Sequence, residues 1–151
     1  MNIKRLKKTE VVELVSKIIG EVDGEKGNWL KTKTQESEAR IFFSQSKPSA
    51  ASKGHWVYDY FHTLGFQTLE EINKESGIMI LINYVDKTYA ILDGGDILWL
   101  AFYSSRMKSN DGFVVDIVID RCSEGNYRLR PYERSNKNFR LVDVKSWKQL
   151  M

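Results

Sequence analysis

The sequence has one cysteine, two histidines and two prolines among its 151 residues, and the first two scarcities exclude whole classes of protein. A lone Cys122 cannot close an internal disulfide, so we exclude a disulfide-stapled secreted domain and expect a cytoplasmic location. His55, His62 and Cys122 lack the spacing of a zinc finger or a zinc protease. We therefore expect no zinc site.

Long apolar runs and low-complexity tracts are also missing. The longest apolar segments, 78–82 and 97–103, fall far short of the roughly 20 residues that a membrane-spanning helix needs. Residues 1–5 lead into charge rather than into the apolar core of a secretory signal. We expect no membrane segment.

The composition is that of an ordinary globular protein, with 42% hydrophobic and 28% charged residues. A chain of this length can bury a sizeable core without disulfides or structural metal. We therefore expect one domain over residues 1–151. It comprises an amphipathic helix at 9–22, a sheet core at 38–132 and a basic segment at 121–151.

The net charge of +3 is unevenly distributed. Residues 121–151 contain three acidic residues (Glu124, Glu133 and Asp143) and eight basic ones: Arg121, Arg128, Arg130, Arg134, Lys137, Arg140, Lys145 and Lys148. A basic stretch of this kind is either a solvated surface or a binding site for an anionic partner, and composition alone leaves both open.

Hydrophobic periodicity predicts three helices and several strands. Apolar residues at spacings of three and four predict a helix over 9–22 with Thr9 as its N-cap. Two shorter helices are expected at 69–75 and 97–105, capped by Thr68 and Asp96. Strands are expected at 29–34, 38–44, 55–63, 78–85, 88–92, 113–120 and 127–131.

Strands follow strands along the chain instead of alternating strictly with helices. The expected fold class is therefore α+β, with a mixed, largely antiparallel curved sheet or open pseudobarrel flanked by two or three helices.

No motif settles a catalytic chemistry. The sequence has no phosphate-binding loop and no Gly-x-Ser-x-Gly elbow. An Mg²⁺-dependent nuclease would need clustered carboxylates, for which Asp93 with Asp96, or Asp116 with Asp120, are the candidates. Neither pair is followed by the Glu-x-Lys or Asp-x-Lys of such enzymes. We expect a domain that is not catalytic by itself and has no cofactor, with Mg²⁺ required only under the nuclease alternative.

Cations and flat rings together favour nucleic-acid binding, because cations replace counterions on phosphates while rings stack on bases. A small, polar, basic loop at 44–54 leads into an aromatic strand, and an arginine face follows at 128–130. The candidate DNA-binding residues are Lys47, Ser49, Lys53, His55, Trp56, Tyr58, Arg106, Lys108, Arg128, Arg130, Arg134 and Lys137. The alternative is that the rings are core residues and the arginines are solvated.

Parts of residues 38–132 resemble the B3-like or PUA-like DNA-recognition domains of bacterial restriction endonucleases. The resemblance rests on Ile41-Phe42-Phe43, Lys47-Pro48, Gly54-His55-Trp56, Tyr58, Phe61, Gly77 to Ile82, Tyr89 to Leu92 and Asn126 to Pro131. It implies that the 47–56 segment and the 128–134 hairpin enter the groove of double-stranded DNA, where some members of the family flip a modified base into an aromatic pocket.

The chain departs from that family by carrying no nuclease domain. The resemblance therefore implies a specificity module, in a bacterial defence role, that works with a nuclease domain or subunit. Two other hypotheses stay open: a small Mg²⁺-dependent nuclease, and a protein-interaction module that uses an aromatic strand face.

Overall fold

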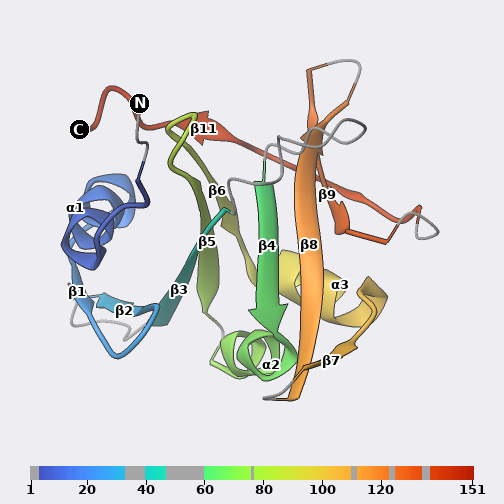
Figure 1. The fold of residues 1–151 in the computed structure, drawn as a ribbon. Helices are drawn as coiled ribbons and strands as arrows, with labels where there is room; N and C mark the ends of the chain where they lie inside the picture. Colours follow the sequence, from blue (N-terminus) through green and yellow to red (C-terminus); the bar gives the residue numbers. More distant parts are fainter. Residues whose placement is uncertain are drawn as a thin grey trace.

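The computed structural model describes residues 4–32, 40–46, 60–75, 77–109, 112–122, 125–133 and 137–151. Within these ranges the chain forms three helices and eleven strands (Figure 1). The helices are α1 (Lys8–Ile19), α2 (Phe66–Lys74) and α3 (Gly94–Tyr103). No helix of the described ranges is long and apolar enough to cross a membrane.

The strands form two mostly antiparallel sheets that do not close into a barrel, so the expected α+β class is confirmed. The first sheet has, in spatial order, β1 (Val22–Gly24), β2 (Trp29–Thr32), β3 (Arg40–Gln45), β5 (Ile78–Asn83), β6 (Thr88–Leu92) and β11 (Lys145–Ser146). The second has β10 (Arg140–Val142), β9 (Tyr127–Pro131), β8 (Gly112–Arg121) and β4 (Tyr60–Gly65), and β7 (Met107–Ser109) also pairs with β8.

Strand β5 is buried on both faces, as its continuous apolar sequence predicts. It pairs in parallel with β3 and antiparallel with β6. Gly77 lies at the start of this pairing, where an added Cβ would lie 2.6 Å from the carbonyl oxygen of Arg40. A larger residue at Gly77 would therefore push β3 and β5 apart.

The larger core lies between the two sheets and is closed at one end by α2 and α3 (Figure 1). Met79 and Leu81 of β5 face this core together with Ile117 and Ile119 of β8. Leu69 of α2, like Ile72, Ile97 and Leu100 on the two helices, is fully buried in it. The two short helices thus cover the apolar gap that the sheets leave open.

A second core lies between α1 and the other face of the first sheet. Ile80 and Ile82, the alternate residues of β5, pack here with Leu14 of α1. Trp147 joins them from the far end of the chain, and its backbone N–H donates to the carbonyl of Lys87 (2.9 Å). The C-terminal segment is therefore part of the fold.

The boundaries of the first helix differ from the sequence prediction. The helix spans Lys8–Ile19 instead of 9–22, because Gly20 adopts a positive φ of 111° and Val22 begins β1. The Glu10 side chain accepts from the Lys7 N–H (2.8 Å), so the helix start does not depend on Thr9.

The other two helices begin three residues earlier than predicted. Helix α2 begins at Phe66, after Gly65 rather than Thr68. Helix α3 is capped by Asp93, whose carboxylate accepts from the Asp96 N–H (2.9 Å) while Asp96 accepts in return from the Asp93 N–H (3.1 Å). Asp96 is thus the reciprocal member of a capping box and not the cap.

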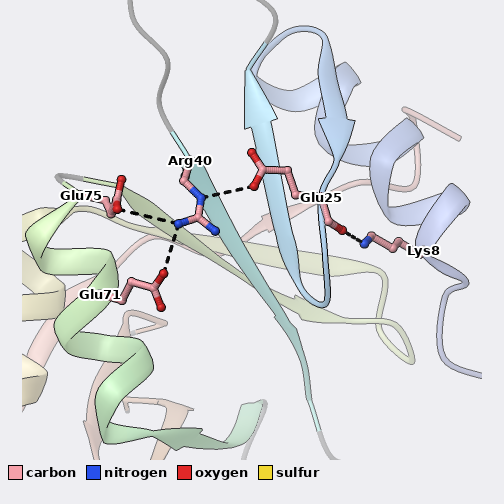
Figure 2. Close-up of polar contacts among 5 residues, drawn as sticks. All are labelled: Lys8, Glu25, Arg40, Glu71 and Glu75. Carbon is pink, nitrogen blue, oxygen red and sulfur yellow. Dashed lines mark hydrogen bonds and ion pairs between the residues drawn. The ribbon is translucent and has the colours of Figure 1, made fainter.

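Arg40 joins three elements through its guanidinium group (Figure 2). Its Nε lies 3.4 Å from a carboxylate oxygen of Glu25 in the β1–β2 turn, and its Nη1 lies 3.1 Å from Glu71 and 3.8 Å from Glu75 at the end of α2. The same group stacks 4.0 Å from the ring centroid of Trp29. One cation therefore separates three carboxylates that would otherwise repel one another.

We expect Arg40→Ala to lower the free energy of unfolding by about 1–3 kcal/mol, from the lost cation–π contact and the uncompensated carboxylates. Urea denaturation measures the change. High salt should shrink the loss, because it screens repulsion between exposed charges. Lys74→Ala, which removes an exposed lysine from α2, is the control. An equal loss in both variants would contradict the role of Arg40.

Candidate nucleic-acid interface

The arginines of β9 share the outer face of the second sheet with Asp120 of β8. Arg128 lies opposite Asp120, and Arg130 lies opposite Val118. Between them, Leu129 lies opposite Ile119, and both of these side chains face the core. Because side chains alternate along a strand, Arg128, Arg130 and Asp120 all point away from the core between the sheets.

Asp120 binds both arginines. Its Oδ1 accepts from Nε of Arg128 (3.1 Å), and its Oδ2 accepts from Nε of Arg130 and lies 3.0 Å from Nη2 of that residue. Arg130 is only 8% exposed, and Asp120 is also buried. The expectation of an exposed arginine face therefore needs correction at Arg130, because a carboxylate on the neighbouring strand holds this guanidinium inside the structure.

Arg128 differs from Arg130 in exposure. It is half-buried, and its guanidinium carbon lies 5.7 Å from the ring centroid of Phe139. Within the described part of the chain its hydrogen bond to Asp120 uses Nε alone. The two terminal amino groups can therefore donate to another partner, while Asp120 restricts the orientation of the group.

The cations before β8 lie at its opposite end. Arg106 stacks on Phe66 at the start of α2, 3.7 Å from the ring centroid. Lys108 of β7 is exposed and lies opposite Phe113. From Phe113 to the level of Arg130 and Arg128, β8 rises roughly 17–24 Å. Arg106 and Lys108 thus share a sheet with the β9 arginines without forming one cluster with them.

The remaining predicted positions divide into two groups. Lys137 is exposed and precedes β10. Outside the described residues are Lys47, Ser49, Lys53, His55, Trp56, Tyr58 and Arg134, and with them most of the strand expected at 55–63.

The described residues that flank the 47–59 segment lie near β9. Tyr60 of β4 pairs with Ile119, which pairs in turn with Leu129. Two strand spacings, roughly 10 Å, therefore separate Tyr60 from Leu129, the residue between the two arginines. Ser46, at the other end of the segment, accepts at Oγ from the N–H of Phe61 (2.9 Å). The two described residues that flank the segment thus lie near the strands that carry the arginine pair.

The aspartates considered for a nuclease all have structural contacts. Asp93 and Asp96 cap α3, and Asp96 also pairs with Nε of Arg140 (2.5 Å). Burial raises the pKa of Asp96, whereas the hydrogen bond from the Asp96 N–H lowers the pKa of Asp93. Asp116 accepts from the Thr63 hydroxyl (2.6 Å). Among the described residues, no three His, Cys, Asp or Glu side chains gather as metal ligands.

Sequence reasoning missed the partner of the arginines, although a signal was present. Antiparallel pairing of β8 with β9 brings Asp120 opposite Arg128, so pairing the strands predicted at 113–120 and 127–131 reveals the contact. It also missed the contact between Ser44 Oγ and His62 Nδ1 (2.8 Å), which joins a strand of the first sheet to one of the second. No spacing in the sequence indicates that contact.

No protein-family model, curated protein or solved structure matches the chain. The candidate interface therefore rests on the contacts described above.

We expect Asp120→Ala to lower the free energy of unfolding by about 3 kcal/mol, because the buried guanidinium of Arg130 loses its carboxylate. Asp116→Ala, whose partner is the exposed hydroxyl of Thr63, should cost only about 1 kcal/mol. The double variant Asp120→Ala/Arg130→Met should be more stable than Asp120→Ala alone. Chemical denaturation compares all three, and equal costs for the two aspartates would refute the buried ion pair.

Proposed function

We propose that this chain is a DNA-binding target-recognition domain that binds double-stranded DNA without cleaving it, as the specificity module of a restriction-type nuclease. The observation that carries the proposal is the position of the two residues that flank the 47–59 segment: Tyr60 lies on the second sheet two strands from β9, and Ser46, just after β3, contacts the neighbouring Phe61. That segment contains Lys47, Lys53 and the rings expected to meet a base, a modified base included.

Arg128 supports the proposal by its geometry. A guanidinium group whose Nε is held by a carboxylate loses less conformational entropy when its terminal groups bind a phosphate or a guanine edge. Arg130 contributes by position: its charge partly offsets that of Asp120, which would otherwise repel phosphates. In this proposal Arg128 contacts DNA, and Arg130 with Asp120 orients it.

An exposed lysine near Arg128 extends the same surface chemistry. Lys137 lies two residues before Phe139, whose ring contacts Arg128, whereas Arg121 contacts the ring of Tyr127 on the opposite face of the sheet. Contacts of this kind position a protein on the DNA backbone and make its affinity dependent on salt.

We expect Arg128→Gln to weaken binding to duplex DNA by about tenfold at low salt and to reduce the slope of log affinity against log salt by about 1. Fluorescence anisotropy with labelled duplexes, methylated and unmethylated, measures both quantities. Lys26→Gln removes one exposed charge from the β1–β2 turn and should change affinity by less than about twofold. The proposal fails if the unmodified chain binds no duplex, or if its binding ignores salt.

A second candidate function, protein–protein interaction, is favoured by the outer face of α3. Phe102 is 78% exposed and Leu98, one turn earlier, is 57% exposed. Tyr103 packs against both Phe102 and Trp99, with ring centroids 4.9 and 5.0 Å apart. A helix with apolar residues all round is normally buried, so this face has the character of a contact surface.

A second copy of this chain fits that face by charge. Asp93 lies at the start of α3, whereas Arg106 and Lys108 follow its end. Two copies related by a two-fold axis with antiparallel α3 helices would bring the acidic end of each helix to the basic end of the other. The sequence suggested a protein-interaction surface on an aromatic strand face, whereas this second candidate uses the outer face of helix α3.

Phe102→Ser should weaken self-association by about tenfold or more, because it removes the most exposed ring of this face. Sedimentation velocity over a series of protein concentrations measures the change. Phe139→Ser removes another exposed phenylalanine, 51% exposed and outside α3, and should leave self-association unchanged. A chain that stays monomeric at every concentration, or equal effects of the two variants, would rule out the α3 dimer.

A further inference from the structure

A half-open cavity of about 270 Å³ lies where the N-terminal segment meets β3 and β4. Its lining residues come from four parts of the chain: Arg5, Asn28, Phe43, Ser44, Gln45 and Thr63. Most of these side chains are polar, and none of the lining residues that the structure describes is acidic. A polar cavity whose described lining includes a cation and no carboxylate suits an anion better than an apolar ligand.

Arg5 is held near this cavity by its neighbour in the chain. The side-chain amide of Gln45 accepts from the Leu6 N–H and donates to the Leu6 carbonyl, each at 2.9 Å. This two-point contact joins residues 39 positions apart and fixes the backbone beside Arg5. Lys4 and Lys7 are exposed on either side, so the segment next to the cavity is basic.

Ser44 supplies a hydroxyl that a buried histidine orients. Its Oγ lies 2.8 Å from Nδ1 of His62, which is 1% exposed and stacks with Tyr60 at 6.0 Å between ring centroids. When Nδ1 carries the proton it donates to Ser44 Oγ, and the Ser44 O–H is then free to donate into the cavity. An anion in the cavity would therefore favour the Nδ1-protonated form of His62.

Two other lining residues, Asn28 and Thr63, have different roles in the cavity. Asn28 is exposed, and its side-chain amide offers further donors. Thr63 donates its hydroxyl proton to Asp116 (2.6 Å), so it closes the wall of the cavity and supplies no donor.

We infer that this cavity binds a small oxyanion, a phosphate or carboxylate group, through Arg5, Ser44 and Asn28. The guanidinium group matches the paired oxygens of such groups, and the hydroxyl and amide add neutral donors. The cavity is smaller than a typical drug-sized pocket, which restricts the ligand to an anion of a few heavy atoms or the anionic end of a larger molecule. This inference does not depend on DNA binding by the β9 arginines.

Titration of the full-length ¹⁵N-labelled chain with inorganic phosphate, with acetate and with a 5′-phosphorylated dinucleotide tests the site by NMR. We expect saturable shifts of the Leu6, Ser44 and Gln45 amides and a change in the His62 ring nitrogens. Saturation by acetate alone would assign the site to carboxylates, and saturation by phosphate or the dinucleotide alone would assign it to phosphoryl groups. Shifts that sodium chloride reproduces at equal ionic strength would overturn the inference.

Two variants distinguish binding at this site from a nonspecific effect of positive charge. Arg5→Gln should weaken anion binding by about tenfold or more, whereas Lys4→Gln, which removes the adjacent charge, should weaken it by less than about twofold. Ser44→Ala should weaken binding and abolish the His62 response. Equal effects of Arg5→Gln and Lys4→Gln would overturn the inference. Arg128→Gln should leave phosphate binding unchanged, so failure of this site and failure of DNA binding are distinguishable.

Discussion

Strand β5 is buried on both faces, and the two cores of the structure pack against opposite sides of it. Met79 and Leu81 contact the core between the sheets, whereas Ile80 and Ile82 contact the core beneath α1. Its parallel pairing with β3 brings the backbone of Gly77 close to the carbonyl oxygen of Arg40. The same pairing positions the Arg40 side chain between the β1–β2 turn and α2. Loss of this strand would remove fully buried residues from both cores at once, and so weaken the packing of α1 on the first sheet and of the first sheet on the second.

Ion pairs distinguish the arginines that stabilise the fold, Arg40 and Arg130, from Arg128, which can also bind a partner. Three carboxylates bind Arg40, and the buried Asp120 binds Arg130, so neither arginine presents much net positive charge to solvent. Arg128 shares Asp120 with Arg130 but keeps two amino groups for a partner. The basic excess of residues 121–151 thus overstates the charge presented to a ligand, because Asp120 lies outside that segment in sequence and next to it in space.

Side-chain contacts attach both ends of the described chain to the rest of the fold. The N-terminal segment is attached to β3 by Gln45, which fixes the backbone beside Arg5 next to the polar cavity. The C-terminal segment returns through β11 to α1, where Trp147 is buried and Lys17 donates to the Leu150 carbonyl. The polar cavity beside Arg5 and the arginines of β9 are two separate sites for which we propose an anionic partner.

Periodicity determined most of the secondary structure. Local spacing predicted α1, the β5–β6 hairpin and β8 within a few residues, because each buries an apolar face that repeats along the chain. Only the tertiary structure decided the helix starts, the burial of Arg130, the contact of Ser44 with His62 and the exposure of Phe102. These features depend on which strands lie opposite one another and what covers each face. The contact of Ser44 with His62 joins two different sheets, and no local spacing indicates it. The helix starts and the Asp120–Arg130 pair use residues close in the chain, but hydrophobic periodicity does not report capping contacts or depth of burial.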